Sequence, residues 1–245
     1  MTTLADPITE LDGVPFLDDG FAARRLLAAV AAARHVAGQR ADLADEVSAD
    51  QAELWLSPSR AVMLVDTDRP IPAVPLGAAR KGQVKASLEY VAATIPDWKL
   101  LLDLPTRFAL LYPPSGAISA SSRAWPQHVL LSAEAFASPS ELAEQIVHEL
   151  AHQWIYLIQE IWALGQHTER RFTLPSGTSH RPPAEVLGAA HVAATLIRLY
   201  QATSNDAEER ISALREYGAG CLALLEVPDL TDAGWAIAQR IKEAL

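Results

Sequence analysis

Two histidines and a glutamate, His148, Glu149 and His152, form an HExxH pattern within the segment QIVHELAHQWIYL. Residues four apart on a helix lie on one face, so both imidazoles can reach a single metal ion. The glutamate then lies beside the metal, where it can act as a general base or hold a ligand or water. Unpaired imidazoles are costly in so apolar a segment, which favours a metal ion as their partner. The alternative is a pair of hydrogen-bonded core histidines. We predict a metal site with Glu149 as its catalytic residue.

A third protein ligand is needed to complete such a site. The metzincin pattern requires a histidine six residues after His152, and Ile158 at that position excludes this class. We predict His191 as the third ligand, because the small residues Gly188 and Thr195 share its helical face and allow a close approach of two helices. The other candidates for this ligand are Glu185, Glu169, His167 and His180.

Residues 112–200 resemble the HExxH-type peptide-modifying proteins found with ribosomally made peptide natural products. The resemblance rests on an extended serine-containing segment from Ser119 to Ser132, the run IVHELAHQWIYLI, the pair Arg181-Pro182 and the spacing Gly188-x-x-His191. Members of this family include iron- and 2-oxoglutarate-dependent enzymes that hydroxylate the β-carbon of a peptide residue. The resemblance implies a peptide substrate as partner, either alone or as a precursor that bears a leader.

The donor set admits two chemistries, because histidine serves iron and zinc alike. Three neutral ligands on an octahedral Fe(II) ion leave room for 2-oxoglutarate and dioxygen, and the far carboxylate of 2-oxoglutarate needs a cation. Arg181 is our first candidate for that cation, with Arg123 and Arg198 as alternatives. Zinc instead keeps one position for a water whose pKa falls to about 7, and Glu149 would take its proton.

We therefore expect metal-dependent modification of a peptide. Our first hypothesis is Fe(II)/2-oxoglutarate-dependent hydroxylation at a β-carbon of a ribosomally made precursor peptide. The alternative is a zinc metallopeptidase that uses Glu149 as its general base. A metal-stabilised protein that binds peptides without catalysis is a third hypothesis.

Composition argues against several other classes. The 245 residues carry a formal charge of −10, whereas a nucleic-acid partner or an anionic membrane surface requires a basic face. No apolar run approaches the roughly 18 residues of a membrane span, and the first residues lack the basic and apolar regions of a signal peptide. Cys221 is the single cysteine, which excludes an intramolecular disulfide and fits a reducing compartment. We expect a cytoplasmic protein.

These residues must be positioned by helices and strands, and the pattern of the sequence predicts a single, mostly helical α+β domain over residues 1–245. We expect a small antiparallel sheet and a zincin-like HExxH helix within it. Within it, we expect residues 1–110 to support the core, 111–203 to hold the metal site and 204–245 to form C-terminal helices. Apolar periodicity, caps and breakers predict helices over 20–38, up to about 56, 82–94, 138–164, 184–202, 207–226 and 231–244. We predict strands over 61–66, 107–112, 117–122 and 128–132, the last two as a hairpin, and a proline-rich loop over 69–75. The run 99–104 fits either a strand or a helix.

Overall fold

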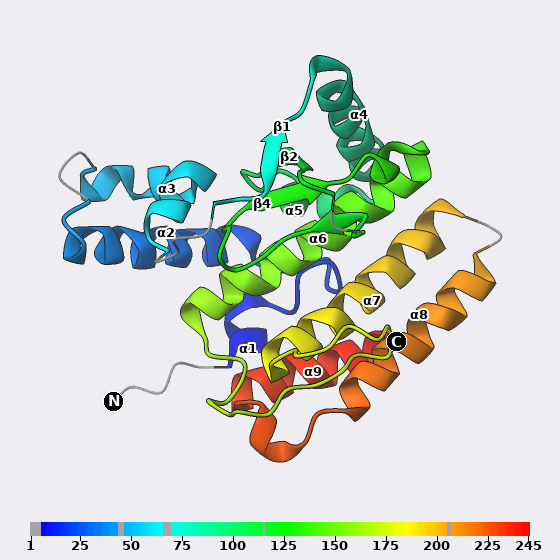
Figure 1. The fold of residues 1–245 in the computed structure, drawn as a ribbon. Helices are drawn as coiled ribbons and strands as arrows, with labels where there is room; N and C mark the ends of the chain where they lie inside the picture. The colour runs from blue at the N-terminus through cyan, green and yellow to red at the C-terminus, as the bar shows by residue number, and fades with distance from the viewer. Residues whose placement is uncertain (1–5, 44–46, 66–69, 115, 205–206) are drawn as a thin grey trace. The chain divides into compact units, whose positions relative to one another are not determined.

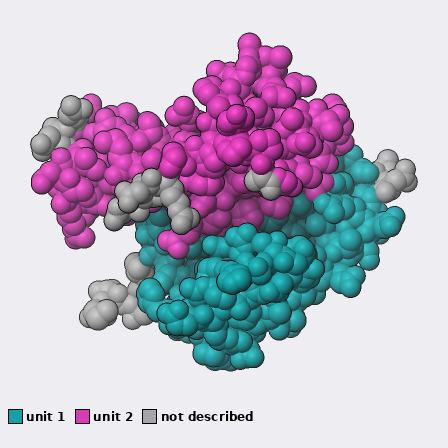
Figure 2. Space-filling view, viewed as in Figure 1, with its two compact units in different colours: residues 1–23, 158–245 teal, residues 24–157 magenta. Residues whose placement is uncertain are grey.

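The computed structural model describes residues 6–43, 47–65, 70–114, 116–204 and 207–245. The described chain is mostly helical with one small sheet, which confirms the predicted α+β class. It divides into two compact units, residues 1–23 with 158–245 and residues 24–157, which Figure 2 colours separately. These units cut across the three parts that the sequence analysis distinguishes.

The unit of residues 24–157 contains a four-stranded sheet (Figure 1). Its strands, in spatial order, are β1 (Ala73–Pro75), β2 (Arg107–Leu111), β4 (His128–Leu131) and β3 (Ser119–Ala120). The outer pairs β1–β2 and β3–β4 are antiparallel, as predicted for the hairpin, but the central pair β2–β4 is parallel. The prediction of a wholly antiparallel sheet is therefore wrong. Strand β3 lies between β2 and β4 in the sequence but at the edge of the sheet, so that β4 returns alongside β2 in the same direction.

The two faces of this sheet differ in character. One face carries a buried cluster of Ala109, Leu111 and Leu130, against which Ala120 and Trp125 pack. Neighbouring residues of a strand point to opposite faces, so Ser119 points away from that cluster. Its hydroxyl meets side chains of helix α6 (Pro139–Ile161), which therefore covers the second face.

Helix α6 begins where the sequence predicts and ends slightly earlier. The Ser138 hydroxyl accepts a hydrogen bond from the Glu141 amide at 3.1 Å, Pro139 occupies the first turn, and the Glu141 carboxylate faces the positive helix end. Its apolar side is completely buried at Ile146, Leu150, Trp154 and Ile155, among others. This burial fixes the rotation of the helix and hence the direction in which the HExxH residues point.

The remaining helices of this unit test several predictions. They are α2 (Ala23–Arg40), η1 (Ala49–Leu56), α3 (Pro58–Met63), α4 (Ala78–Thr94), η2 (Pro96–Trp98) and α5 (Lys99–Leu102). The predicted helices over 20–38 and 82–94 correspond to α2 and α4, and α5 resolves the ambiguous run 99–104 as a helix at its start. Within the helix predicted up to about 56, residues 44–46 lie outside the described residues.

Two predictions near the sheet are wrong. The strand predicted over 61–66 is helical as far as Met63, because the Ser57 carbonyl accepts from the amides of Arg60 and Ala61 and begins α3. A short apolar run does not distinguish a helix from a strand by itself. The loop predicted over 69–75 contains strand β1. Residues 66 and 69 lie outside the described residues.

The unit of residues 1–23 and 158–245 is built around helix α7, most of which is buried. Its elements are α1 (Pro7–Leu11), α7 (Pro183–Thr203), α8 (Glu208–Ala223), η4 (Val227–Asp229) and α9 (Asp232–Ala244). Helices α7 and α8 lie side by side, and α9 packs against both α7 and α1 (Figure 1). The three predicted C-terminal helices are confirmed, with α8 ending earlier than expected. No helix within the described ranges has the length and apolarity required to cross a membrane.

Candidate metal centre

His148 and His152 lie on the same face of α6, one turn apart. Their ring centroids are 5.1 Å apart and the rings are inclined by 62°. A metal ion about 2.1 Å from one nitrogen of each ring lies about 3.2 Å from each centroid, which places the two centroids about 4.5 to 5.2 Å apart at octahedral or tetrahedral angles. The observed separation therefore fits two imidazoles bound to one ion. The His148 side chain is 35% exposed, so solvent and dissolved ions can reach it.

A stacking contact orients the second histidine. The His152 ring lies nearly parallel to the Tyr156 ring, with an angle of 14° and a centroid distance of 6.0 Å. Tyr156 follows His152 by one helical turn, so this contact is local to α6 and comes with the helix. The ring of His152 thus contacts an aromatic neighbour on each side, His148 and Tyr156.

Glu149 lies beside the two histidines and is buried, with 3% of its surface exposed. Its Oε1 atom is 3.9 Å from His148 Nε2. The same oxygen accepts a hydrogen bond from the Ser119 hydroxyl of strand β3 at 2.6 Å. The carboxylate is therefore adjacent to the imidazole pair and held from the sheet side.

The described residues contain no cluster of three or more histidine, cysteine, aspartate or glutamate side chains arranged to hold a metal ion. The structure brings together His148, His152 and Glu149, as the sequence predicts. The third ligand stays a prediction.

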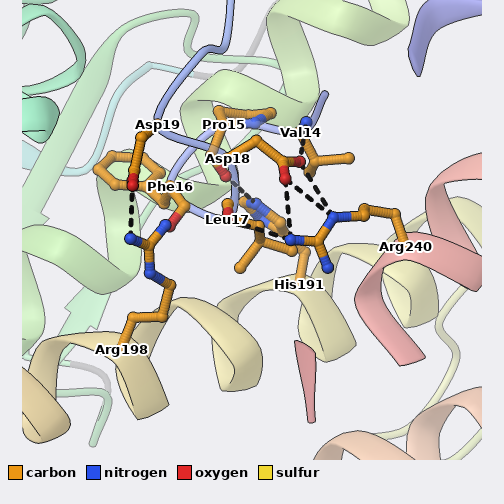
Figure 3. A network of polar contacts seen from close by, with 9 residues as sticks. All are labelled: Val14, Pro15, Phe16, Leu17, Asp18, Asp19, His191, Arg198 and Arg240. Atoms are coloured by element: carbon orange, nitrogen blue, oxygen red, sulfur yellow. Dashed lines mark hydrogen bonds and ion pairs between the residues drawn. The ribbon is translucent and has the colours of Figure 1, made fainter. Parts of the chain in front are cut away.

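His191, the predicted third ligand, lies in the unit of residues 1–23 and 158–245 and is completely buried on α7. Its Nε2 atom is 2.8 Å from the Pro15 carbonyl oxygen (Figure 3). A carbonyl only accepts, so Nε2 carries the hydrogen and Nδ1 carries the lone pair. Nδ1 is buried and has no hydrogen-bond partner among the described residues. Burial lowers the pKa of the His191 imidazole to about 4, against which the Pro15 hydrogen bond acts weakly.

The low pKa of His191 predicts a pH-dependent stability in metal-free protein. His191 binds a proton near pH 6.5 in the unfolded protein and only near pH 4 in the folded protein. Its contribution to the free energy of unfolding is therefore fully present above pH 6.5 and is lost as the pH falls toward 4. Between about pH 7.5 and pH 5, the wild type should lose about 2 kcal/mol relative to His191→Gln. Urea unfolding with a chelator present measures this difference, and parallel pH profiles for the two proteins would contradict it.

The Pro15 carbonyl that contacts His191 belongs to a segment, residues 14–19, that is held by side chains of α7 and α9 (Figure 3). Arg198 donates to the Phe16 carbonyl at 2.8 Å and to Asp19 at 2.7 Å. Arg240 donates to Asp18 at 2.9 Å. Arg198, an alternative candidate for binding the co-substrate carboxylate, thus already donates hydrogen bonds to this segment.

Arg181, the first candidate for that carboxylate, forms an ion pair with Glu185 at 2.7 Å. The pair joins the candidate cofactor-binding residue, which precedes α7, to the candidate third ligand Glu185 in the first turn of α7. Both side chains are more than one-third exposed, so breaking the pair costs little, about 0.2 to 1 kcal/mol. The remaining candidates, Arg123, Glu169, His167 and His180, are all exposed in loops or turns.

No protein-family model and no curated protein matches this chain. The resemblance to HExxH-type peptide-modifying proteins therefore stays a hypothesis, and the geometry of His148, Glu149 and His152 is the basis for a proposed function.

Sequence reasoning missed the partners of two predicted site residues. Ser119 lies in the segment that carries the resemblance, but nothing in the sequence assigns its hydroxyl to Glu149, which follows 30 residues later. The Pro15 carbonyl is a backbone group, for which no side-chain pattern exists. The signal that was available for Ser119 is its place on a short strand directly before the HExxH helix.

The single cysteine lies in the unit of residues 1–23 and 158–245, on α8, and is completely buried. Burial raises the pKa of the Cys221 thiol to about 11, only partly offset by a hydrogen bond with Tyr217. The native thiol should therefore react with a chromogenic disulfide reagent at about pH 8 at least about 100-fold more slowly than in urea. Equal rates in the native and unfolded protein would contradict this prediction.

Proposed function

We propose that this protein is a metal-dependent enzyme that modifies a peptide, with His148 and His152 as metal ligands. The observation that carries the proposal is the pair of imidazoles at 5.1 Å on one face of α6, with a buried carboxylate next to them. Neutral imidazoles suit iron(II) and zinc, and the partial exposure of His148 provides access for the ion. His191 remains the predicted third ligand.

Strand β3 supports a peptide as the substrate. It lies at one edge of the sheet and pairs on one side only, with β4, among the described strands. An extended peptide can add to such an edge through main-chain hydrogen bonds. Ser119 of this strand contacts Glu149, so a peptide added here would lie close to the HExxH residues.

As the reaction we propose Fe(II)/2-oxoglutarate-dependent hydroxylation of a peptide side chain at its β-carbon. Bound together, iron(II) and 2-oxoglutarate supply the activation of dioxygen for the hydroxylation of a C–H bond. In this reaction Glu149 holds a metal ligand or a water in place, and its burial and its hydrogen bond with Ser119 suit that role. Arg181 would bind the far carboxylate of 2-oxoglutarate after release of its exposed ion pair with Glu185.

A zinc peptidase is the second candidate, and one distance favours it. Glu149 Oε1 lies 3.9 Å from His148 Nε2, beyond a direct hydrogen bond, so the imidazole does not engage the carboxylate, which can receive a proton from a nearby water. In this reaction Glu149 is the general base, and Glu149→Gln removes turnover while the fold remains intact.

The experiment that separates these functions starts from metal-free protein under anaerobic conditions. One sample receives Fe(II) and 2-oxoglutarate followed by oxygen, and succinate is measured; a second receives Zn(II) and a peptide library, and cleavage is measured. Succinate formed with iron, and lost in His148→Ala, supports hydroxylation. Cleavage with zinc alone supports the peptidase. Metal and peptide binding without either product supports a binding protein, and the absence of metal binding overturns the proposal.

A titration with 2-oxoglutarate follows if succinate is absent, because turnover without the peptide is slow when the substrate is needed for oxygen activation. Binding that requires Fe(II) and is weakened in Arg181→Gln supports the oxygenase and assigns the arginine. His191→Ala in the same titration tests the third ligand. A failure to bind 2-oxoglutarate overturns the oxygenase but leaves the peptidase to be tested with zinc.

A further inference from the structure

The hydroxyl of Ser119 lies between two oxygen atoms of α6. It is 2.6 Å from Glu149 Oε1 and 2.6 Å from Gln145 Oε1, and Gln145 Nε2 donates to Glu141 at 2.9 Å. A hydroxyl has one hydrogen and can donate to one of these oxygens at a time. The bond to a carboxylate is charge-assisted and stronger, so the hydrogen belongs to the bond with Glu149.

The orientation of Gln145 is set by its own hydrogen bond, because its Nε2 donates to Glu141 and leaves its Oε1 on the side of Ser119. Gln145 Oε1 is therefore a second acceptor that competes with Glu149 for the one hydrogen of Ser119. The charge-assisted bond to the Glu149 carboxylate is the stronger of the two, so Ser119 links strand β3 to Glu149.

The position of Glu149 makes this restraint important for a metal ion. Its carboxylate is buried 3.9 Å from His148 Nε2, and a carboxylate oxygen is itself a good ligand for iron(II) or zinc. Without a hydrogen bond to hold it, the carboxylate would turn toward the ion and bind it. It would then no longer be available to act on a neighbouring water or ligand.

We propose that Ser119 is a positioning residue that holds the Glu149 carboxylate beside the metal and prevents it from becoming a ligand. This inference rests on the proposed metal centre and deepens it. It also gives strand β3 a second role, since the residue that restrains Glu149 belongs to the edge on which the peptide is proposed to bind.

The chain offers a matched control close to Ser119. Ser121 is two residues after Ser119, just beyond the end of strand β3. The Ser121 hydroxyl is buried and has no hydrogen-bond partner among the described residues. Ser121→Ala therefore removes a hydroxyl from the same region without removing a bond to Glu149.

The test is a titration of metal-free protein with Co(II) and Zn(II) against a competing chelator, with the visible spectrum of the Co(II) form as a second readout. Ser119→Ala should bind these ions about 10-fold more tightly than the wild type and show an altered Co(II) spectrum, because the carboxylate joins the ligands. Ser119→Thr keeps the hydroxyl and should match the wild type. Ser121→Ala should also match it.

A double-mutant cycle decides whether Ser119 acts through Glu149. In a Glu149→Gln background the carboxylate is absent, and Ser119→Ala should change neither the affinity nor the spectrum. Unchanged or weaker binding by Ser119→Ala, or an effect that persists undiminished in the Glu149→Gln background, would overturn the inference and leave the metal centre in place. A wild type that binds neither ion overturns the proposed function itself, and this inference with it.

Discussion

His148→Ala and His152→Ala should each weaken the binding of Co(II) or Zn(II) by at least about 100-fold. The two imidazoles lie together on one face of α6, with their ring centroids 5.1 Å apart, and both are proposed to bind the same ion. A single remaining histidine binds an ion only weakly, so we expect a loss in both variants. Competition with a chelating indicator measures the affinity, and the same titration with Fe(II) is performed without oxygen.

His35→Gln is the matched control for this experiment. His35 lies on α2, in the same unit as His148 and His152 but outside the candidate ligands, and the change removes the same imidazole group. We expect the affinity of this variant for both ions to equal that of the wild type. If His148→Ala and His152→Ala lose no more affinity than His35→Gln does, the metal centre on α6 is wrong.

Gly234→Ala should destabilise the unit of residues 1–23 and 158–245 by about 2 to 3 kcal/mol, although it adds a single methyl group. Gly234 is buried in the first turn of α9, where its amide donates to the Thr231 hydroxyl at 3.1 Å and caps the helix. A Cβ atom at this position would overlap the carbonyl oxygen of Leu164. That oxygen belongs to the backbone and cannot rotate away, so α9 or the segment around Leu164 must shift.

The control is Gly82→Ala, in the exposed part of helix α4. A Cβ atom there has no neighbour within 4 Å among the described residues, so the change should stabilise the protein by about 0.5 to 1 kcal/mol through helix propensity alone. Urea unfolding of both variants measures the two effects. Stabilisation by Gly234→Ala would show that the close approach to Leu164 is absent in solution.

The sequence was sufficient to predict most helices, because each has a start signal or a strong apolar period. Helix α6 is the best example, with Ser138 and Pro139 at its start and a long apolar side. It was insufficient for short segments of the sheet. The run 61–66 has the apolar character of a strand, yet the helix begun at Pro58 continues through its first half. β1 has only three residues and is defined by pairing with β2, which no local pattern reveals.

The candidate site shows the same division between local and tertiary information. His148, Glu149 and His152 could be predicted together, since helical spacing alone places them side by side. The restraint by Ser119 depends on how β3 packs against α6, and the Pro15 contact of His191 joins residues 176 positions apart. Such contacts depend on the packing of elements that are distant in the sequence, and spacing rules do not reach them.

The contacts that His191, Arg198 and Arg240 make with residues 14–19 have a consequence for folding during synthesis. Asp18 is synthesised 222 residues before Arg240, and Pro15 is synthesised 176 residues before His191. Chains fold during synthesis as their segments emerge, so residues 24–157 leave the ribosome while the early segment still lacks both partners. Until α7 and α9 have been translated, the carbonyl oxygens of Phe16 and Leu17 lack the arginines that donate to them in the folded protein. The polar contacts that hold residues 14–19 therefore form late, after the unit of residues 24–157 has been synthesised.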